Sequence, residues 1–178
     1  MAHISSMGAG IYSYLDIFTG TIPDGTDTSA EFAALYAAGT LGTDVIRMPS
    51  VREFPSIGTP ANIVNVPVFG QATSSQIQGQ SDAPSLEITV NYIAEDMQDI
   101  HALIDGQTKV FRFLMSSVPV SEAEATGVAT IAADNTEFYF IGKVEAILVN
   151  PALTDATTAT VTMSAQSDFV GPATVAAT

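Results

Sequence analysis

Apolar and polar residues alternate along several stretches of the chain, and a period of two is typical of strands with one buried face. The clearest stretches are SLEITVNYI at 85–93 and TTATVTMSAQS at 157–167, and KVFRFLM at 109–115 is a shorter one. Each predicts a strand whose apolar side chains lie in a common core. The side chains on these apolar faces are Leu86, Ile88, Val90, Tyr92, Phe111, Phe113, Met115, Ala159, Val161, Met163 and Ala165.

The stretch EFYFIGKVEAILVNP at 137–151 predicts one long strand. Its even-numbered positions form a continuous apolar face: Phe138, Phe140, Gly142, Val144, Ala146 and Leu148. Its odd-numbered positions mix charged and apolar side chains: Glu137, Tyr139, Ile141, Lys143, Glu145, Ile147 and Val149. This second face is neither cleanly polar nor cleanly apolar, and a simple sheet does not explain it.

Proline breaks the pattern in two further apolar stretches, VIRMPSVREFPSIG at 45–58 and ANIVNVPVFG at 61–70. Proline cannot donate to a strand ladder, so we expect these stretches to form irregular strands at sheet edges or bulges. The stretch GQATSSQIQGQSDAP at 70–84 is polar, contains glycine and carries no charge before Asp82. It predicts a long mobile loop or arm.

Two stretches have helical spacing of apolar residues. In AEDMQDIHALIDG at 94–106, acidic residues gather at the N-terminal end, where the helix dipole favours them, and Gly106 is placed to end the helix. The stretch TSAEFAALYAAG at 28–39 predicts a weaker helix. There Thr28 and Glu31 have the spacing of a capping box, and Gly39 is placed to end the helix.

The charge of the chain is strongly one-sided, with 19 acidic and five basic residues and a net charge of −14. Nucleic-acid binding by phosphate neutralisation requires clustered Lys and Arg, so this composition argues against it. Charged residues are only 13% of the chain and apolar residues 47%, which favours surfaces buried between subunits. The chain contains no cysteine, so neither disulfides nor cysteine metal sites are expected. It has no apolar stretch of membrane-spanning length and no pattern of a secretory signal, so membrane insertion is not expected.

Residues suited to catalysis are scarce, since the chain has only two histidines, His3 and His101. A metal site made of His101 with Asp99 and Asp105 is conceivable from the helical spacing, but a solvated acidic helix face fits the pattern better. The paired carboxylates and the PDGTDT segment lack the partners that hydrolases and calcium loops need. We therefore expect no catalytic residue, no cofactor and no metal, and we interpret the chain as a structural part and not an enzyme.

The order of these elements resembles the major tail tube protein of long-tailed, lambda-like bacteriophages. The residues that carry the resemblance are GQSDAPSLEITVNY, AEDMQDIHALIDGQ, TKVFRFLMSS and NTEFYFIGKVEAILVNPALTDATTATVTMSAQSD, within about residues 45–170. The resemblance implies a mainly β fold, a β-sandwich or half-open barrel of antiparallel strands with one flanking α-helix. It implies a single tail tube domain over 1–178, with an N-terminal arm at about 1–44 and the inter-strand loop at about 70–84. The first 40 residues depart from the family pattern.

The family forms hexameric rings that stack into a tube and conduct DNA during ejection. Each subunit of such a ring has a core, a surface toward the lumen and a surface toward its neighbours. The mixed face of 137–151 then passes from water or the lumen, at Glu137 to Glu145, to a neighbouring subunit. Candidate contacts between subunits are Ile147, Val149, Gln76 and Gln78. Candidate lumen residues, chosen from the polar faces of the two clearest strands, are Glu87, Thr89, Asn91, Thr160, Thr162, Ser164 and Gln166; exposure to outer solvent is the alternative for each.

The implied partners are further copies of the chain, tail tip and tail terminator proteins, the tape measure protein, and DNA that passes without specific binding. The implied location is the virion tail, assembled in the host cytoplasm. An alternative reading is a monomeric β-sandwich binding module for a cell-surface glycan or protein. Such a module needs an exposed aromatic platform, which the five tyrosines could supply.

Overall fold

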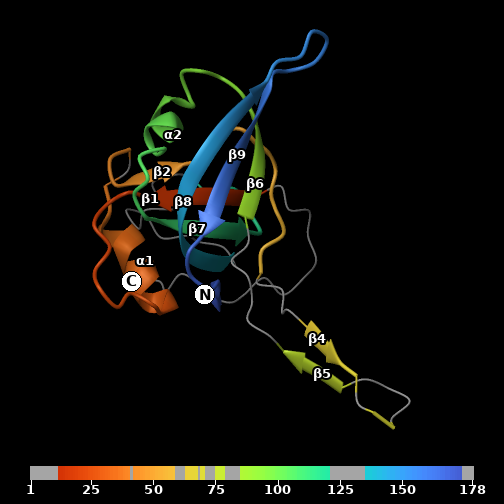
Figure 1. Ribbon diagram of the computed structural model, residues 1–178. Coiled ribbons are helices and arrows are strands. Elements are labelled where there is room, and N and C mark those ends of the chain that lie inside the picture. The colour runs from red at the N-terminus through yellow and green to blue at the C-terminus, as the bar shows by residue number, and fades with distance from the viewer. Residues whose placement is uncertain are drawn as a thin grey trace.

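The main sheet is antiparallel and contains most strands of the chain (Figure 1). The computed structural model describes residues 12–40, 42–58, 63–67, 69–70, 75–78, 85–120 and 135–173. The strands run in the order β2-β1-β7-β8-β9-β6-β3, and β10 pairs with β8. Their bounds are β1 Ser13–Phe18, β2 Val45–Arg47, β3 Val51–Glu53, β6 Ser85–Asn91, β7 Lys109–Ser116, β8 Asn135–Asn150, β9 Thr158–Ala165 and β10 Val170–Ala173. The predictions of strands at 85–93, 109–115, 137–151 and 157–167 are confirmed.

The sheet curls because its two edge strands are tied together. β2 and β3 lie at opposite ends of the strand order, yet only residues 48–50 separate them in sequence. The Met48 N–H donates to the Leu15 carbonyl on one side, at 2.8 Å, and the Asn91 N–H donates to the Ser50 carbonyl on the other, at 3.0 Å. The predicted antiparallel half-open barrel is therefore confirmed, and the proline-rich stretch forms its short edge strands as expected.

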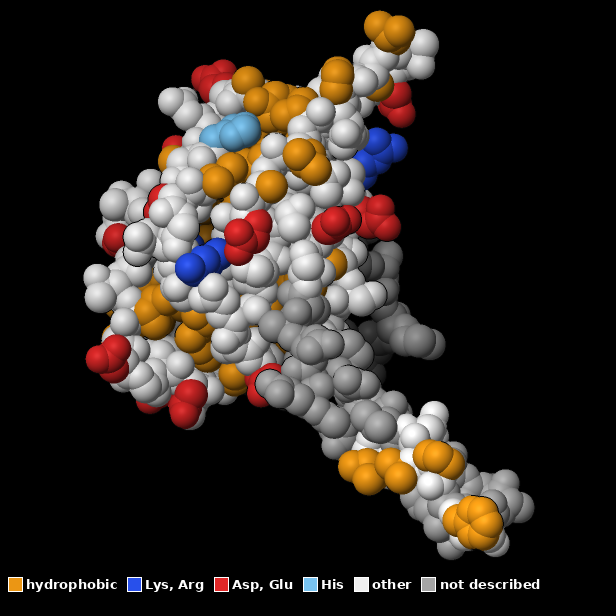
Figure 2. All heavy atoms as spheres, in the orientation of Figure 1, with side chains coloured by type: hydrophobic (Ala, Val, Ile, Leu, Met, Phe, Trp, Pro, Cys, Tyr) orange, Lys and Arg blue, Asp and Glu red, His pale blue; other side chains and the backbone are white. Residues whose placement is uncertain are grey.

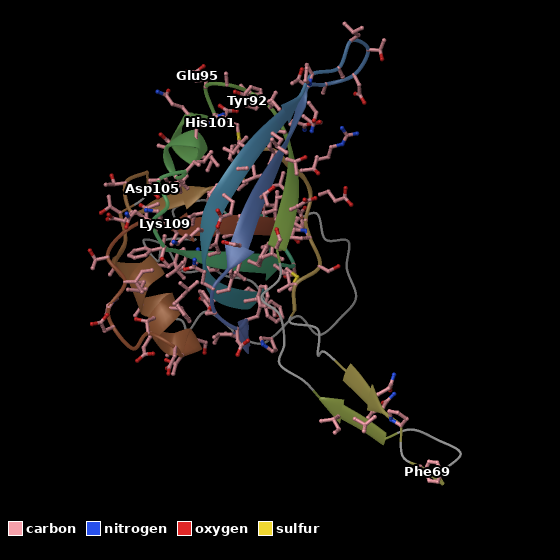
Figure 3. All side chains as sticks on the ribbon, in the orientation of Figure 1. Phe69, Tyr92, Glu95, His101, Asp105 and Lys109 are labelled. Atoms are coloured by element: carbon pink, nitrogen blue, oxygen red, sulfur yellow. The ribbon has the colours of Figure 1, made fainter. Side chains whose placement is uncertain are left out.

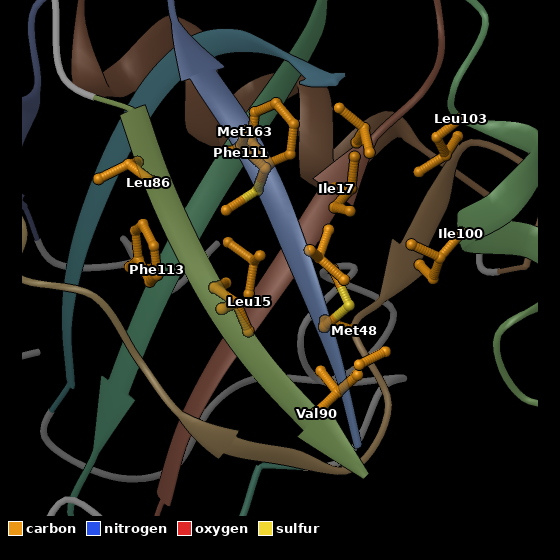
Figure 4. Close-up of a cluster of buried hydrophobic side chains, with 14 of the residues drawn as sticks. Leu15, Ile17, Met48, Leu86, Val90, Ile100, Leu103, Phe111, Phe113 and Met163 are labelled. Carbon is orange, nitrogen blue, oxygen red and sulfur yellow. The ribbon is translucent and has the colours of Figure 1, made fainter. Parts of the chain in front are cut away.

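The inside of the curled sheet holds the main apolar core (Figure 4). Alternate residues of β6, β7 and β9 point inward, which follows from the period of two in a pleated strand. Helix α2, Gln98–Ala102, is not part of the sheet but contributes Ile100 to this core, together with its cap residues Met97 and Leu103. Fully or nearly fully buried members on the strands include Leu15, Ile17, Leu86, Ile88, Val90, Phe111, Phe113, Phe140, Val144, Ala159, Val161, Met163 and Ala165.

The first half of β8 has two buried faces. Phe138, Phe140 and Val144 pack in or against the main core. On the opposite face, Tyr139 and Ile141 belong to a second apolar cluster beneath helix α1, Ser29–Ala38. Glu137 and Tyr139 are thus buried, so the expectation that Glu137 to Glu145 face water or a lumen is wrong at this end of the strand, whereas Glu145 at the other end is exposed.

A β-bulge divides β8 into two halves. Val144 and Ala146 pair with consecutive residues of β9, so Glu145 is an extra residue in the ladder. Beyond this bulge the alternation reverses: Ile147 packs against the main core, while Leu148 is 60% exposed. The predicted continuous apolar face is therefore wrong beyond residue 144, because one inserted residue exchanges the inner and outer positions.

Helix α1 is the helix that covers the outer face of the sheet, and its predicted capping box is confirmed. The Glu31 N–H donates to the Thr28 hydroxyl oxygen at 3.4 Å, and the Thr28 N–H donates to the Glu31 carboxylate at 3.0 Å. Phe32 and Tyr36 lie on the buried side of the helix, and Gly39 is its C-cap. The caps and the buried aromatic residues explain why this helix is the longer of the two.

Replacing Thr28 with alanine is expected to lower the free energy of unfolding by about 1 kcal/mol. The change removes a side-chain acceptor for one of the unpaired N–H groups at the start of the helix. Urea denaturation followed by circular dichroism measures it, and Ser29→Ala, one residue further along, is the control. Equal stability of the two variants would contradict the capping role.

Helix α2 is shorter than its apolar spacing predicts. Residues 94–97 form a turn, and Met97 at the N-cap supplies no side-chain hydrogen bond. The helix ends near Leu103, before Gly106, which lies in a later turn with a φ of +72°. The expectation that this helix extends to Gly106 and is the more secure of the two is wrong. Its N-terminus has no side-chain cap, and after its C-cap the chain turns at Asp105, whose carboxylate accepts from the Gln107 N–H at 2.8 Å.

The segment between β3 and β6 contains a second, two-stranded sheet. β4, Ile63–Val66, pairs antiparallel with β5, Ser75–Gln78, and this hairpin projects from the body in Figure 1. Residues 75–78 of the predicted loop 70–84 are therefore a strand. Part of the predicted arm at 1–44 also differs from expectation, since β1 lies inside the main sheet between β2 and β7.

Candidate assembly surfaces and a buried charge cluster

The polar faces of β6 and β9 form one continuous hydroxyl-rich surface. The two strands pair directly along their whole length, so the two sets of predicted lumen residues lie side by side. The facing pairs are Ser85 with Ser164, Glu87 with Thr162, Thr89 with Thr160 and Asn91 with Thr158. Gln166 is exposed just beyond β9, and its side chain accepts from the Thr108 hydroxyl at 3.4 Å. The structure thus gathers these residues on one outer face, and their contact with a lumen stays a prediction.

Acidic side chains border this surface. Glu87 and Glu145 are exposed, and Glu145 accepts a hydrogen bond from the Ser164 hydroxyl. Glu53, on β3, pairs opposite Thr89 and is also exposed. The basic residues on the neighbouring strands are Lys143 on β8, which is half-buried, and Arg52 on β3, which is exposed. Figure 2 shows acidic side chains clearly commoner than basic ones on the visible face. The surface therefore offers hydroxyl groups and carboxylates and not a cationic track.

Most of the exposed large apolar side chains lie at two ends of the molecule, although Figure 2 shows others on the body and Val118, after β7, is also exposed. At the end formed by the β8–β9 hairpin and α2 they are Ile93, Ile104, Leu148, Val149 and Leu153. On the β4–β5 hairpin they are Val66, Phe69 and Ile77. Of the predicted subunit contacts, Val149 and Gln76 are exposed, Ile147 is half-buried against the core, and Gln78 lies in β5 with its side chain outside the described part.

A cluster of charged residues lies buried under α1, and no pattern in the sequence predicted it. The Arg47 Nε lies 2.7 Å from the Asp16 Oδ1, and the Arg112 Nη2 lies 2.8 Å from the Asp16 Oδ2. Asp16 and Arg112 face each other across β1 and β7. Burial alone would raise the pKa of Asp16, but Arg112 and Arg47 together hold this pKa below its ordinary value. Asp16 is therefore a buried carboxylate between two cations.

Glu137 completes the cluster from β8. Its Oε1 lies 3.7 Å from the Arg112 Nη1, and its Oε2 accepts from the Tyr139 hydroxyl. Burial raises the pKa of Glu137 by more than the charge of Arg112 lowers it. The Tyr36 hydroxyl donates toward the carbonyls of Asp16 and Val110, at 3.0 and 2.8 Å. This cluster fastens α1 to the sheet.

The tyrosines do not form an exposed aromatic platform. Tyr36 and Tyr139 are buried, and the ring of Tyr36 lies 4.1 Å from the guanidinium carbon of Arg112. Tyr14 is half-buried beneath Arg47 at 4.2 Å, and Tyr92 stands edge-on to His101. These four tyrosines therefore serve packing and ion contacts, Tyr12 is half-buried, and the glycan-binding alternative gains no support from them.

Two of the three residues considered for a metal site, His101 and Asp105, have other partners (Figure 3). His101 lies 3.4 Å from the Tyr92 hydroxyl, and the Asp105 carboxylate bonds the Lys109 ammonium at 3.1 Å and the Gln107 N–H at 2.8 Å. In the part of the chain that the structure describes, no group of three or more metal-binding side chains is close enough to hold an ion. No described helix is long and apolar enough to cross a membrane.

Comparison with known proteins shows the fold and no family. No protein-family model matches the sequence, and no curated protein matches it. The structure is similar to a chain of the six-fold symmetrised baseplate of the anti-feeding prophage, with a TM-score of 0.54 and 8% identity, over 94% of this chain and 98% of that one. It also matches a chain of the SPP1 tail tube, at a TM-score of 0.45 and 12% identity, over 74% of this chain and 70% of that one. This chain shares its fold with the baseplate protein.

Proposed function

We propose that this chain is a structural component of a phage-like tail, the subunit of a tube built from stacked hexameric rings. The observation that carries the proposal is the likeness to the baseplate chain, which extends over nearly the whole of both chains. That baseplate is six-fold symmetrised, which supports six copies in a ring. Under this proposal residues 1–178 form one tail tube domain.

The free strand edges support assembly with further copies. Among the described residues, β8 beyond Gly142 pairs with β9 alone, and the part of β6 before Thr89 pairs with β9 alone. An unpaired edge is a template for a strand of another chain. In a closed head-to-tail ring each such edge meets the next copy, so the main sheets would join into one wall.

The acidity of the chain suits a passage for DNA. Six copies of −14 give −84 for a ring. The repulsion is screened within about 8 Å at physiological salt, and that range is sufficient to prevent adhesion to the wall. The hydroxyl-rich face of β6 and β9, with Glu87 at its edge, is the proposed lining. A lining of Lys and Arg would bind the DNA and slow its passage, because binding would release counterions from the phosphates.

The wider partners follow from the same proposal. A tube of this kind ends on tail tip and tail terminator proteins, assembles around a tape measure protein in the host cytoplasm, and lets DNA pass without specific binding. The apolar side chains at the two ends of the molecule are the surfaces proposed for stacking. No enzymatic step and no cofactor is part of the proposal.

Electron microscopy of the purified chain tests this function. We expect negative-stain images with six-fold rings or stacked tubes, together with sedimentation coefficients far above that of a single 18.5 kDa chain. Apolar interfaces strengthen in kosmotropic salt, so sulfate should increase the assembled fraction. Single globular particles under all these conditions would contradict the proposal and favour the monomeric binding module.

Deletion of residues 72–80 is expected to abolish tube formation while the body stays folded. The deletion removes β5, and among the described residues β4 and β5 pair with each other and with no strand of the main sheet. Far-UV circular dichroism and the thermal midpoint report the fold, and electron microscopy reports the tubes. Tubes of normal length from this variant would refute the role of the hairpin in assembly.

A further inference from the structure

An apolar pocket opens on the body of the molecule near the start of β1. It has a volume of about 280 Å³, and its walls include Phe54, Ile57, Phe113, Met115 and Phe138. None of its lining residues carries a charge. A cavity of about 150 Å³ is enough to hold a benzene ring, so this pocket has room for an aromatic side chain with apolar neighbours.

The β4–β5 hairpin carries an apolar tip that matches such a pocket. The side chain of Phe69 is 107% exposed at the far end of the hairpin (Figure 3), and Val66 and Ile77 on the paired strands are also exposed. The chain contains no charged residue between Glu53 and Asp82. An isolated two-stranded hairpin is marginally stable in water, so this hairpin is expected to gain stability from a partner.

The distribution of charge indicates what the partner is. A chain with a net charge of −14 repels a second copy wherever acidic surfaces meet. The hairpin and the pocket both lack charge, so they are surfaces on which two copies can approach without this repulsion. They are also different surfaces of the same molecule. When a hairpin tip on one copy binds a pocket at a different site on the next copy, the contact is head-to-tail. Head-to-tail contacts build rings and helical stacks.

The geometry points to a specific contact: the hairpin tip of one copy, led by Phe69, inserts into the Phe54–Ile57–Phe138 pocket of the next copy. This inference rests on the proposed self-assembly and names the pair of surfaces that performs it. Burial of the Phe69 ring among the side chains of Phe54, Phe113 and Phe138 supplies most of the binding energy of this contact. The polar residues of β5, such as Gln76, then lie at the rim.

Site-specific cross-linking tests the contact, because the chain has no cysteine of its own. A tagged Phe69→Cys variant is mixed with an untagged Ile57→Cys variant under assembly conditions and treated with a short bis-maleimide. The expected product is a pair containing one tagged and one untagged chain. The matched control replaces Phe69→Cys by Leu153→Cys, which is equally exposed at 105% on the β8–β9 hairpin and is expected to give no mixed pair with Ile57→Cys.

A Phe69→Cys/Ile57→Cys double variant distinguishes docking between copies from folding back within one copy. A cross-linked single chain without mixed pairs would overturn the inference, as would mixed pairs formed equally well by the Leu153→Cys control. Rings in electron micrographs without a 57–69 link would overturn this contact and leave the proposed function standing. Single particles with no link would overturn both.

A binding measurement tests the same contact without altering the body of the molecule. Phe69→Ala is expected to raise the concentration required for half-assembly about 10- to 100-fold, in sedimentation of the full chain. The exposed position of Phe69 leaves the fold intact, so circular dichroism of this variant is expected to match the unaltered chain. Assembly by Phe69→Ala at the unaltered concentration would overturn the inference.

Discussion

Replacing Asp16 with asparagine is expected to lower the free energy of unfolding by about 3–5 kcal/mol. Asp16 is the carboxylate shared by the buried guanidinium group of Arg112 and the half-buried one of Arg47. The asparagine has a similar shape but no charge, so both cations lose their closest counter-charge, and that of Arg112 is lost in the buried interior. Removing one partner of a buried ion pair is costly for this reason. Urea denaturation at a fixed protein concentration measures the change.

Glu137→Gln is the control for Asp16→Asn, because it changes the other carboxylate of the same cluster. Burial raises the pKa of Glu137, so the folded chain favours the protonated carboxyl over the ionised one. We therefore expect a much smaller loss than for Asp16→Asn. Equal losses in the two variants, or a change below about 1 kcal/mol for Asp16→Asn, would contradict the central role of Asp16.

The effect of Asp16→Asn depends on pH with a definite sign. The pKa of Asp16 is lowered in the folded chain below 3.8, so the folded state holds fewer protons on this group than the unfolded state. Its contribution is fully present above about pH 4 and is lost as the pH falls through the lowered pKa. The difference in stability between the two proteins should therefore narrow in acid. The raised pKa of Glu137 acts in the opposite direction, since its contribution is greatest in acid and decreases as the pH rises.

Replacing Gly142 with alanine is expected to lower the free energy of unfolding by about 3 kcal/mol. Gly142 lies at the point where β8 passes from its pairing with β7 to its pairing with β9. A Cβ atom there would overlap the Ser164 carbonyl oxygen and approach the Phe140 ring at 3.0 Å. Both obstacles are held by the sheet, so the strands must separate to admit the methyl group.

Thermal denaturation measures the Gly142→Ala effect, and a fall in the midpoint of about 6–12 °C is expected for a chain of this size. Lys143→Ala, the next position of β8, is the control, because its side chain is half-exposed. Its expected change is within about 0.5 kcal/mol. A Gly142→Ala midpoint close to that of the unaltered chain would show that β9 can move away from β8 without loss.

Local patterns in the sequence predicted much of the fold. The alternation in β6, β7 and β9 identified their buried faces, because the side chains of a strand alternate whatever its neighbours are. The Thr28 and Glu31 spacing identified the capping box, since both partners lie within one helical turn. The polar faces of β6 and β9 were also correctly identified, and only their adjacency required the structure.

The features that the sequence did not predict depend on contacts between distant segments. Asp16 and Arg112 are 96 positions apart, and only the register of β1 on β7 brings them together. The bulge at Glu145 leaves the letters of the sequence alternating as before, because it is set by pairing with β9. The pocket near Phe54 and the exposed tip at Phe69 likewise required three-dimensional positions.

The short link at 48–50 has a mechanical consequence. The curled sheet cannot flatten unless the hydrogen bonds from Met48 to Leu15 and from Asn91 to Ser50 break, and the covalent chain still joins its two margins afterwards. Each molecule is accordingly a stiff, curved building block. Any larger assembly of such molecules must bend at the interfaces between them. Its elasticity is therefore a property of those interfaces, and substitutions there can alter it without disturbing the fold of the subunit.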